Sequence, residues 1–292
     1  MLTRLLVSAG VAMLAACATT DNAKTGAAGF DGARLETVLA AQKPEDQARY
    51  KWRHPKETLE FFGVAPGMTV VDTLPGGVWY SGILAAYLGP EGEVIGVDYS
   101  TEMWKLFGRF ANDEFLAKKA TWAADWVRDS ASWAPADGAK IAGVAYGAVP
   151  DAMKGTADVV MMVRAFHHFN RFEEEGGFRT AALADAMAIL KPGGVVGIVQ
   201  HRAPESNSDK WAEGDNGYVK QSEIIKAFEA AGFEFVGSSE INANPADKPS
   251  ESDLVWRLPP SLATSRENPE LKAQMEAIGE SDRMTLKFRK PE

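Results

Sequence analysis

Hydrophobic residues along the chain repeat with two periods, one typical of buried strands and one typical of helices. Seven short apolar runs predict strands: TVVD, EVIGVD, IAGVA, DVVMMV, GVVGIV, FEFVGSSEI and MTLKFRK. Between them, apolar positions recur every three or four residues, as in HPKETLEFFGV, ILAAYL, FRTAALADAMAIL and KQSEIIKAFEAAG. Nearly continuous apolar strands separated by helices predict an α/β fold with a mostly parallel sheet and helices on both faces. The last run alternates apolar and polar residues, as an edge or antiparallel strand does.

Polar and glycine-rich segments follow the predicted parallel strands. Right-handed crossovers bring the carboxyl ends of such strands to one edge of the sheet, where α/β proteins bind their ligands. The polar residues placed at this edge are Asp72, Asp98, Arg164, His167, His168, His201 and Arg202. Three of the four histidines of the chain are therefore expected at one rim.

The turn after the first strand, TLPGGVWYSG, contains Gly76 and Gly77 and is a candidate cofactor-binding loop. A phosphate-binding P-loop is excluded, because Ile83 and Leu84 stand where its lysine and its serine or threonine would be. A dinucleotide-binding loop needs the pattern G-x-G-x-x-G, which this turn lacks. A cofactor without phosphates needs only a close approach of the backbone, and the turn is compatible with that.

The segment VVDTLPGGVWYSGILAAYLGPEGEVIGVDYS resembles the first two motifs of class I S-adenosylmethionine-dependent methyltransferases. The resemblance implies a Rossmann-like sheet of seven mostly parallel strands and the binding of S-adenosylmethionine. It assigns Asp98 to the ribose hydroxyls of the cofactor. It also places Asp72, Gly76 and Gly77 at the cofactor turn.

The chain departs from this family in part. Leu74 and Val78 stand at two of the three glycine positions of the turn, and no acid follows the third strand where the family often contacts adenine. Even so, HPKETLEFFGVAPGMTVVD, PGGVWYS, RAFHHF and GESDRMTLKF together are similar to a bacterial group of methyltransferases, many with export signals. The implied reaction is methyl transfer to an unidentified small-molecule acceptor.

The residues after the fourth and fifth strands lie where this family holds the acceptor. Histidine changes charge near neutral pH, so His168 or His201 is a candidate general base. Arg164, His167 and Arg202 are candidate substrate-binding residues, because guanidinium groups pair with carboxylates and phosphates. The alternatives are that a histidine of the adjacent pair is packed in the core and that either arginine pairs with a neighbouring acid.

Other segments have both a functional and a structural interpretation. Three imidazoles together with Asp151 would suit zinc, although the chain has no short-spaced pair of metal ligands. Trp122 and Trp126 are four residues apart on one helical face, which favours core packing over an aromatic lid. The segment GESDRM, with Glu280, Asp282 and Arg283, predicts a solvated turn or a local ion pair.

The first residues, MLTRLLVSAGVAMLAAC, combine a basic residue, an apolar stretch and small residues, which is typical of a secretory signal. LAAC resembles the bacterial lipoprotein box, in which Cys17, the single cysteine of the chain, would be lipidated. The resemblance implies that residues 1–16 are a signal peptide, residues 17–29 a flexible tether and residues 30–292 the methyltransferase-like domain. It also implies a periplasmic lipoprotein held in the outer membrane of a Gram-negative envelope. An ordinary cleaved signal, with Cys17 incidental, is the alternative.

Charge and location narrow the function further. The 292-residue chain has a formal net charge of −9, which argues against a nucleic-acid partner. S-adenosylmethionine is made in the cytoplasm, whereas an exported domain would act outside it. Two functions therefore compete, namely a methyltransferase and a non-catalytic binding lipoprotein on a degenerate methyltransferase scaffold. A nicotinamide-dependent oxidoreductase is a third hypothesis.

Overall fold

One sheet of eight strands organises the chain in the computed structural model, which describes residues 29–292. Cys17 and the signal-like sequence before it lie outside the described residues. In chain order the strands are β1 (Thr69–Thr73), β2 (Glu93–Asp98), β3 (Lys140–Ala145), β4 (Ala157–Val163), β5 (Leu190–Ala203), β6 (Val219–Lys220), β7 (Glu234–Ser239) and β8 (Arg283–Arg289).

The strands are ordered β3-β2-β1-β4-β5-β8-β7 across the sheet, and the two-residue β6 pairs with the end of β5. Neighbours from β3 to β5 are parallel, whereas β8 runs antiparallel to both β5 and β7. Without β6, this is the order 3-2-1-4-5-7-6 that is typical of class I methyltransferases. The predicted fold class is confirmed, including the antiparallel last strand, and the periodicity missed β6.

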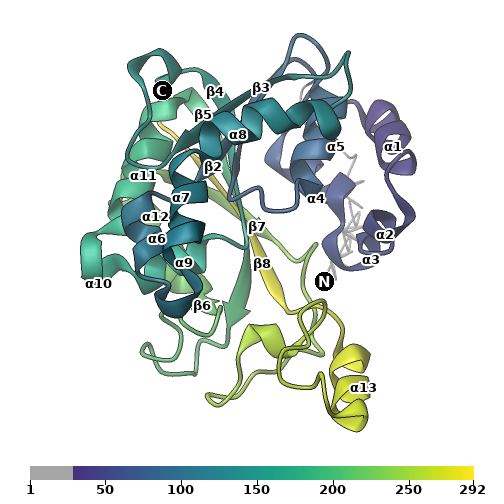
Figure 1. The fold of residues 1–292 in the computed structure, drawn as a ribbon, viewed down its shortest axis with the longest axis vertical. Coiled ribbons are helices and arrows are strands. Elements are labelled where there is room, and N and C mark those ends of the chain that lie inside the picture. The colour runs from purple at the N-terminus through teal and green to yellow at the C-terminus, as the bar shows by residue number, and fades with distance from the viewer. Residues whose placement is uncertain (1–28) are drawn as a thin grey trace, which may run out of the picture.

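Helices cover both faces of the sheet (Figure 1). The helices before β4 are α1 (Gly32–Ala40), α2 (Pro44–Gln47), α3 (Tyr50–Arg53), α4 (Pro55–Phe62), α5 (Trp79–Leu88), α6 (Thr101–Lys105), α7 (Asp113–Ala120) and α8 (Trp122–Asp129). Those after β4 are α9 (Phe166–Arg171), α10 (Glu173–Gly176), α11 (Phe178–Ile189), α12 (Gln221–Ala230) and α13 (Pro269–Ile278). Figure 1 shows α1, α4 and α5 on one side of the sheet and α9, α11 and α12 on the other.

Two hydrophobic cores lie on the two faces of the sheet, because successive strand residues point to opposite sides. On β1, Val70 packs against α1, α4 and α5, whereas Val71 packs against the helices of the other face. On β4, Val159 and Val160 divide in the same way. All four side chains are at most 2% exposed, and burying a valine of this kind contributes roughly 1.5–3 kcal/mol. The two cores hold the sheet rigid and so fix the residues at its carboxyl edge.

The predicted core packing of the tryptophan segment is confirmed for Trp126. Its side chain on α8 is buried, and its indole N–H donates to the Ala142 carbonyl of β3 at 3.1 Å. Trp122 stacks on it with ring centroids 5.4 Å apart. The sheet makes room with two glycines, since a Cβ at Gly96 would lie 2.6 Å from the Trp126 ring and one at Gly143 would lie 3.0 Å from it.

Replacing Gly96 with alanine should therefore destabilise the fold by about 1–3 kcal/mol, because the new methyl group overlaps the Trp126 ring. Urea denaturation of Gly96→Ala measures this loss. Gly77→Ala is the control, because a Cβ at Gly77 meets no atom within 4 Å. Equal stability of the two variants would contradict the packing of Trp126 on the sheet.

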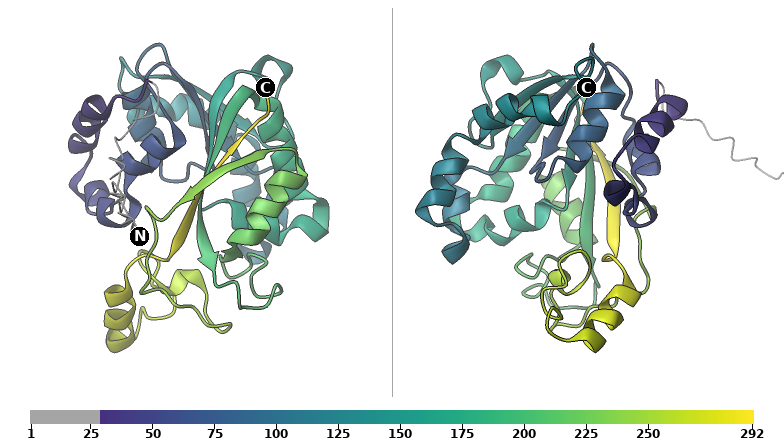
Figure 2. Two further views of the ribbon diagram at one scale, coloured as in Figure 1. Left: turned by 180° about the vertical axis from the view of Figure 1, so that it is seen from behind. Right: turned by 45° about the vertical axis from the view of Figure 1, so that its right-hand side comes forward.

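Two regions differ from the periodicity of the sequence. The spacing of Met103, Phe107 and Phe110 predicts a helix over residues 101–110, but α6 ends at Lys105, and Gly108 with a φ of 63° turns the chain before α7. Residues 242–282, between β7 and β8, had no predicted helix or strand, yet they contain α13 and fold around the end of the sheet where β5 finishes (Figures 1 and 2). Within residues 29–292, no helix combines the length and the hydrophobicity that a membrane span requires.

Candidate functional site

Two of the cavities at the carboxyl edge of the parallel strands adjoin the predicted cofactor acid Asp98 and the three predicted histidines. The β2–β3 cavity, of about 520 Å³, follows the ends of β2 and β3, and its lining residues include Tyr99, Met103, Lys119, Tyr146, Phe169 and Phe178. The β4–β5 cavity, of about 250 Å³, follows the ends of β4 and β5, and its lining residues include Arg164, His167, His168, His201, Trp256 and Glu280. The Tyr99 hydroxyl and His168 Nδ1 are hydrogen-bonded at 3.0 Å, so this pair contributes to the wall between the two cavities.

Asp98, at the end of β2, is buried and bound by the protein itself. One carboxylate oxygen accepts hydrogen bonds from the Tyr99 N–H at 2.8 Å and the Trp104 indole N–H at 3.2 Å. The other accepts from Lys119 Nζ at 2.7 Å. Burial raises the pKa of Asp98, whereas the charge of Lys119 acts to lower it. Asp98, the predicted ribose acid, therefore lies behind the wall of the β2–β3 cavity. Lys119, which lines that cavity, covers its carboxylate.

Sequence reasoning missed Lys119. It lies on α7, where its Nζ is also 4.3 Å from the ring centroid of Trp104. In the sequence it is 21 residues from Asp98 and stands beside Lys118, which is an exposed lysine paired with Glu114. Nothing in the local pattern distinguishes the two lysines, because only the folding of α7 over β2 brings one of them to the carboxylate.

Asp72, at the end of β1, is also buried and accepts a hydrogen bond from the Ser81 hydroxyl at 2.5 Å. Burial raises the pKa of Asp72 to about 6, against the opposing effects of Ser81 and Arg164. Neither Asp72 nor Asp98 lines either of the two cavities. The structure thus does not bring the two predicted cofactor acids to a shared cleft, because Ser81 of α5 and Lys119 of α7 occupy their carboxylates.

The raised pKa of Asp72 predicts a pH-dependent effect on stability. Its folded pKa of about 6 lies above the ordinary value, so the ionised carboxylate destabilises the fold above pH 6 and has no effect below about pH 4. Asp72→Asn should therefore raise the free energy of unfolding by about 2–3 kcal/mol at pH 8 and leave it unchanged at pH 4. Urea denaturation at both pH values checks this, and a variant less stable than the wild type at pH 8 would contradict it.

The predicted cofactor turn is open and strained. Gly76 and Gly77 are exposed, and a Cβ at Gly77 would meet nothing within 4 Å. Leu74 and Val78, at the family's glycine positions, adopt φ values of 51° and 57°, which branched and bulky side chains rarely do. Trp79 packs edge-on against two tyrosine rings of the α1–α4–α5 side. Neither Val78 nor Trp79 lines the two cavities.

The structure brings the three predicted histidines together. The ring centroids of His167 and His168, on the short helix α9, are 4.0 Å apart, and those of His167 and His201 are 5.7 Å apart. His201 Nδ1 is hydrogen-bonded to the Ser281 hydroxyl at 2.6 Å. Burial lowers the pKa of His167 to about 4 and moves the pKa values of His168 and His201 well below the ordinary value. All three imidazoles are therefore neutral at pH 7.

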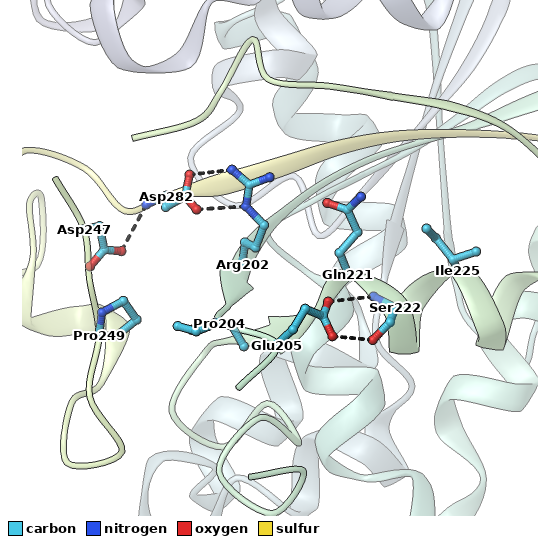
Figure 3. Close-up of a pocket in the computed structure, with 10 residues that line it drawn as sticks. Arg202, Pro204, Glu205, Gln221, Ser222, Ile225, Asp247, Pro249 and Asp282 are labelled. Carbon is cyan, nitrogen blue, oxygen red and sulfur yellow. Dashed lines mark hydrogen bonds and ion pairs between the residues drawn. The ribbon is translucent and has the colours of Figure 1, made fainter. Parts of the chain in front are cut away.

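Arg202, a predicted substrate-binding residue, lies away from these histidines. Adjacent residues of a strand point to opposite faces, so His201 lines the β4–β5 cavity, whereas Arg202 lines a third cavity of about 480 Å³ between the end of β5 and α12. The guanidinium forms paired hydrogen bonds of 2.7–3.0 Å with Asp282 and Glu240, and Figure 3 shows the pairing with Asp282. The alternative weighed for Arg202, pairing with neighbouring acids, is the one observed.

The GESDRM segment is not the solvated turn that the sequence suggested. Glu280 and Arg283 are 5% and 2% exposed, and Glu280 pairs with Arg283, Arg53 and Arg49 at 3.0–3.4 Å. The local ion pair is therefore correct but is part of a larger buried cluster. Arg53 and Arg49 were missed, since they lie more than two hundred residues away in the sequence and contact Glu280 only in the folded chain.

The zinc hypothesis has no support from the position of Asp151. Its side chain is exposed and pairs with Lys154, away from the residues that line the β4–β5 cavity. No group of three histidine, cysteine, aspartate or glutamate side chains suited to a metal occurs within the described range.

The residues around the β2–β3 cavity fit an adenosyl group in their chemistry. Tyr146, Phe169 and Phe178 give it aromatic and apolar walls for a purine ring. Asp98 at its border is an acceptor of the kind that ribose hydroxyls need, provided that Lys119 turns away from it. The fit is thus conditional on one side chain.

Comparison with known proteins is limited to the fold. Neither a family model nor a curated protein matches the chain. Solved structures to which it is similar include a SAM-dependent methyltransferase from Aquifex aeolicus, with a TM-score of 0.45 at 18% identity, covering 73% of this chain and 94% of that one. Another is CrArsM, an arsenic(III) S-adenosylmethionine methyltransferase from Chlamydomonas reinhardtii, with a TM-score of 0.43 at 14% identity, covering 90% and 74%. A third is the [4+2]-cyclase SpnF, with a TM-score of 0.48 at 16% identity, covering 82% and 80%. The sequence identity to these three solved structures is 14–18%, and the strand order described above is the feature that the chain has in common with class I methyltransferases.

Proposed function

We propose that the protein transfers a methyl group from S-adenosylmethionine to a small-molecule acceptor. The observation that supports this most strongly is the pair of adjoining cavities at the carboxyl edge of the sheet. One has aromatic walls and borders the acid at the end of β2, and the other contains three neutral histidines. This division matches the needs of a reaction that holds a cofactor and an acceptor side by side.

The residues of the chain would act mainly by binding and orientation. Asp98 would accept hydrogen bonds from the ribose diol, and the open turn at Gly76 and Gly77 would admit the rest of the cofactor. When bound, S-adenosylmethionine supplies an electrophilic methyl group. Alignment of two reactants is worth about 7–11 kcal/mol in intramolecular reactions. His168 and His201 are proposed as bases for an acceptor that carries a proton, since both are neutral at pH 7.

We also propose that the domain works in the cell envelope, held in the outer membrane through a lipid on Cys17. The support is the sequence of the first seventeen residues alone. Labelling of the expressed protein with a radioactive fatty acid tests this. Label in the wild type but not in Cys17→Ser supports the anchor, and equal labelling or none in either protein contradicts it.

Calorimetric titration of the purified full-length protein with S-adenosylhomocysteine tests the cofactor proposal. Saturable binding that is lost in Asp98→Ala supports it. Glu102→Ala is the matched control, because Glu102 lines the same cavity but pairs only with the exposed Lys105. Binding that survives in Asp98→Ala and is lost in Glu102→Ala would contradict the role of Asp98.

A second function is favoured by one observation, namely that Lys119 already occupies the Asp98 carboxylate. In that case the protein is a non-catalytic binding lipoprotein on a methyltransferase scaffold. The same titration separates the two functions. Absence of binding at millimolar S-adenosylhomocysteine supports the binding protein, and NAD(H) binding in its place would support the oxidoreductase hypothesis.

A further inference from the structure

Buried positive charge gathers behind the β4–β5 cavity. Glu280 is the carboxylate among the residues that line this cavity. Three guanidinium groups share it, with Arg53 Nε at 3.0 Å, Arg283 Nη1 at 3.1 Å and Arg49 Nε at 3.4 Å. Arg53 and Arg283 are each at most 3% exposed. One carboxylate therefore faces three guanidiniums in a place that water hardly reaches.

Arg164 adds a fourth guanidinium, and it lines the cavity directly. Its Nε is buried without a hydrogen-bond partner within residues 29–292. The other carboxylate on which its charge acts is Asp72, which is hydrogen-bonded to Ser81. Four guanidiniums thus share two carboxylates. The cluster carries an excess of positive charge that the described chain does not neutralise.

The charge and the backbone of Arg164 are both in unfavourable settings. Burial and the charges of Arg53 and Arg283 lower the pKa of Arg164 to about 9, as expected for a guanidinium held in a site of like charge. Its backbone has a φ of 57°, a conformation that residues other than glycine rarely adopt. The Arg164 side chain as a whole is partly exposed, so its charge can reach a ligand, and backbone strain of this kind collects at ligand-binding sites.

His167 adds a hydrogen-bond acceptor to the same cavity. The Gln200 amide N–H donates to the Gly217 carbonyl at 2.8 Å, which turns the Gln200 carbonyl oxygen toward His167. This oxygen is 3.2 Å from His167 Nδ1, so Nδ1 carries the proton and Nε2 keeps its lone pair. Nε2 is buried and has no partner in the described chain. A ligand that donates a hydrogen bond would satisfy it.

We propose that the β4–β5 cavity binds a small anion that carries a carboxylate or phosphate group together with a hydroxyl group. Arg164 pairs with the anionic group, the charges of Arg53 and Arg283 reinforce it, and His167 Nε2 accepts from the hydroxyl. The statement that this anion is the methyl acceptor rests on the proposed function. The statement that the cavity binds an anion does not. The carboxylate of the cofactor's own amino-acid part has the same chemistry and is the other source that the experiment must separate.

Titration of the full-length protein with inorganic phosphate at constant ionic strength tests whether the β4–β5 cavity binds an anionic group through Arg164. Saturable binding is expected in the wild type, and Arg164→Asn should weaken it at least tenfold, or ~1.4 kcal/mol. Asparagine is chosen because it tolerates the left-handed backbone better than other polar residues. Arg171→Asn is the control, since Arg171 follows closely in the sequence but pairs with Asp215 outside the cavity. No saturable binding in the wild type, or equal binding in Arg164→Asn, would overturn the proposal.

The stability of the same variants separates a binding role from a structural one. Without phosphate, Arg164→Asn should unfold at the same temperature as the wild type or higher, because it relieves the repulsion that Arg53 and Arg283 exert on the Arg164 charge. With phosphate, only the wild type and Arg171→Asn should gain stability. A loss of stability in Arg164→Asn without phosphate would show that Arg164 holds the fold together, and it would overturn its assignment to the ligand.

Lactate and propionate test the hydroxyl group, since they differ in that group alone. The wild type should bind lactate about fivefold more tightly than propionate, the value of one ordinary hydrogen bond. His167→Phe should bind the two equally. A wild type that does not distinguish them would overturn the part assigned to His167.

Titration with S-adenosylhomocysteine in saturating phosphate identifies the source of the anion. Independent binding of the two supports an anionic acceptor, whereas competition would assign the cluster to the cofactor's carboxylate and overturn the acceptor. Phosphate binding without any binding of S-adenosylhomocysteine would keep the anion site and remove the methyltransferase proposal. The two proposals therefore fail by different results.

Discussion

Glu280→Gln should destabilise the protein by about 4 kcal/mol, because it leaves buried guanidinium groups without their shared counter-charge. The variant keeps the shape of the side chain but removes the carboxylate that Arg53, Arg283 and Arg49 contact. Two of these guanidiniums are at most 3% exposed, so water cannot replace the lost partner. The change in the midpoint of urea denaturation, at unchanged slope, measures the loss.

A matched control is available elsewhere in the chain. Glu240→Gln removes a carboxylate that forms two hydrogen bonds with Arg202. The Glu240 side chain is 65% exposed, so the expected loss is at most about 1 kcal/mol. If Glu280→Gln cost no more than Glu240→Gln, the cluster would be open to water, and its charge would no longer favour a bound anion.

Lys119→Met should increase the affinity for S-adenosylhomocysteine about tenfold while lowering the stability of the free protein by about 3 kcal/mol. The ammonium group competes with the ribose hydroxyls for one oxygen of Asp98. Removing the ammonium group leaves the buried Asp98 carboxylate without one of its hydrogen-bond donors. The ribose hydroxyls of the cofactor can then supply that donor. Calorimetry measures the affinity, and thermal denaturation measures the stability.

The neighbouring lysine provides the control for this prediction. Lys118→Met removes an exposed ammonium paired with the exposed Glu114, so it should change neither cofactor affinity nor stability by more than about 0.5 kcal/mol. Weaker cofactor binding in Lys119→Met would mean that Lys119 contributes to the site instead of closing it.

The sequence predicted the fold because its elements are local and strongly periodic. Each apolar run is flanked by helical periodicity, and the parallel order follows from that alternation. The same rule placed His167, His168 and His201 at one edge, and the structure has them side by side. The prediction that Arg202 lies beside these histidines was wrong. The alternation of side chains along a strand could have shown this, because a residue next to His201 in a strand points to the opposite face.

The rest of the site depends on contacts between distant segments, which periodicity does not reveal. Lys119 reaches Asp98 from α7, and Arg53 reaches Glu280 from the other end of the chain. The resemblance to a cofactor motif assigned Asp72 and Asp98 by their position at strand ends. It did not show that Ser81 and Lys119 would occupy the carboxylates. Position at the rim and availability to a ligand are separate properties.

A crystal structure of the full-length protein grown with S-adenosylhomocysteine tests the central claim most directly. We expect the adenosine part in the β2–β3 cavity, the ribose hydroxyls hydrogen-bonded to Asp98, and Lys119 Nζ moved from its position 2.7 Å from that carboxylate. A structure with the Lys119–Asp98 pair intact and no adenosine in the cavity at saturating ligand would contradict it.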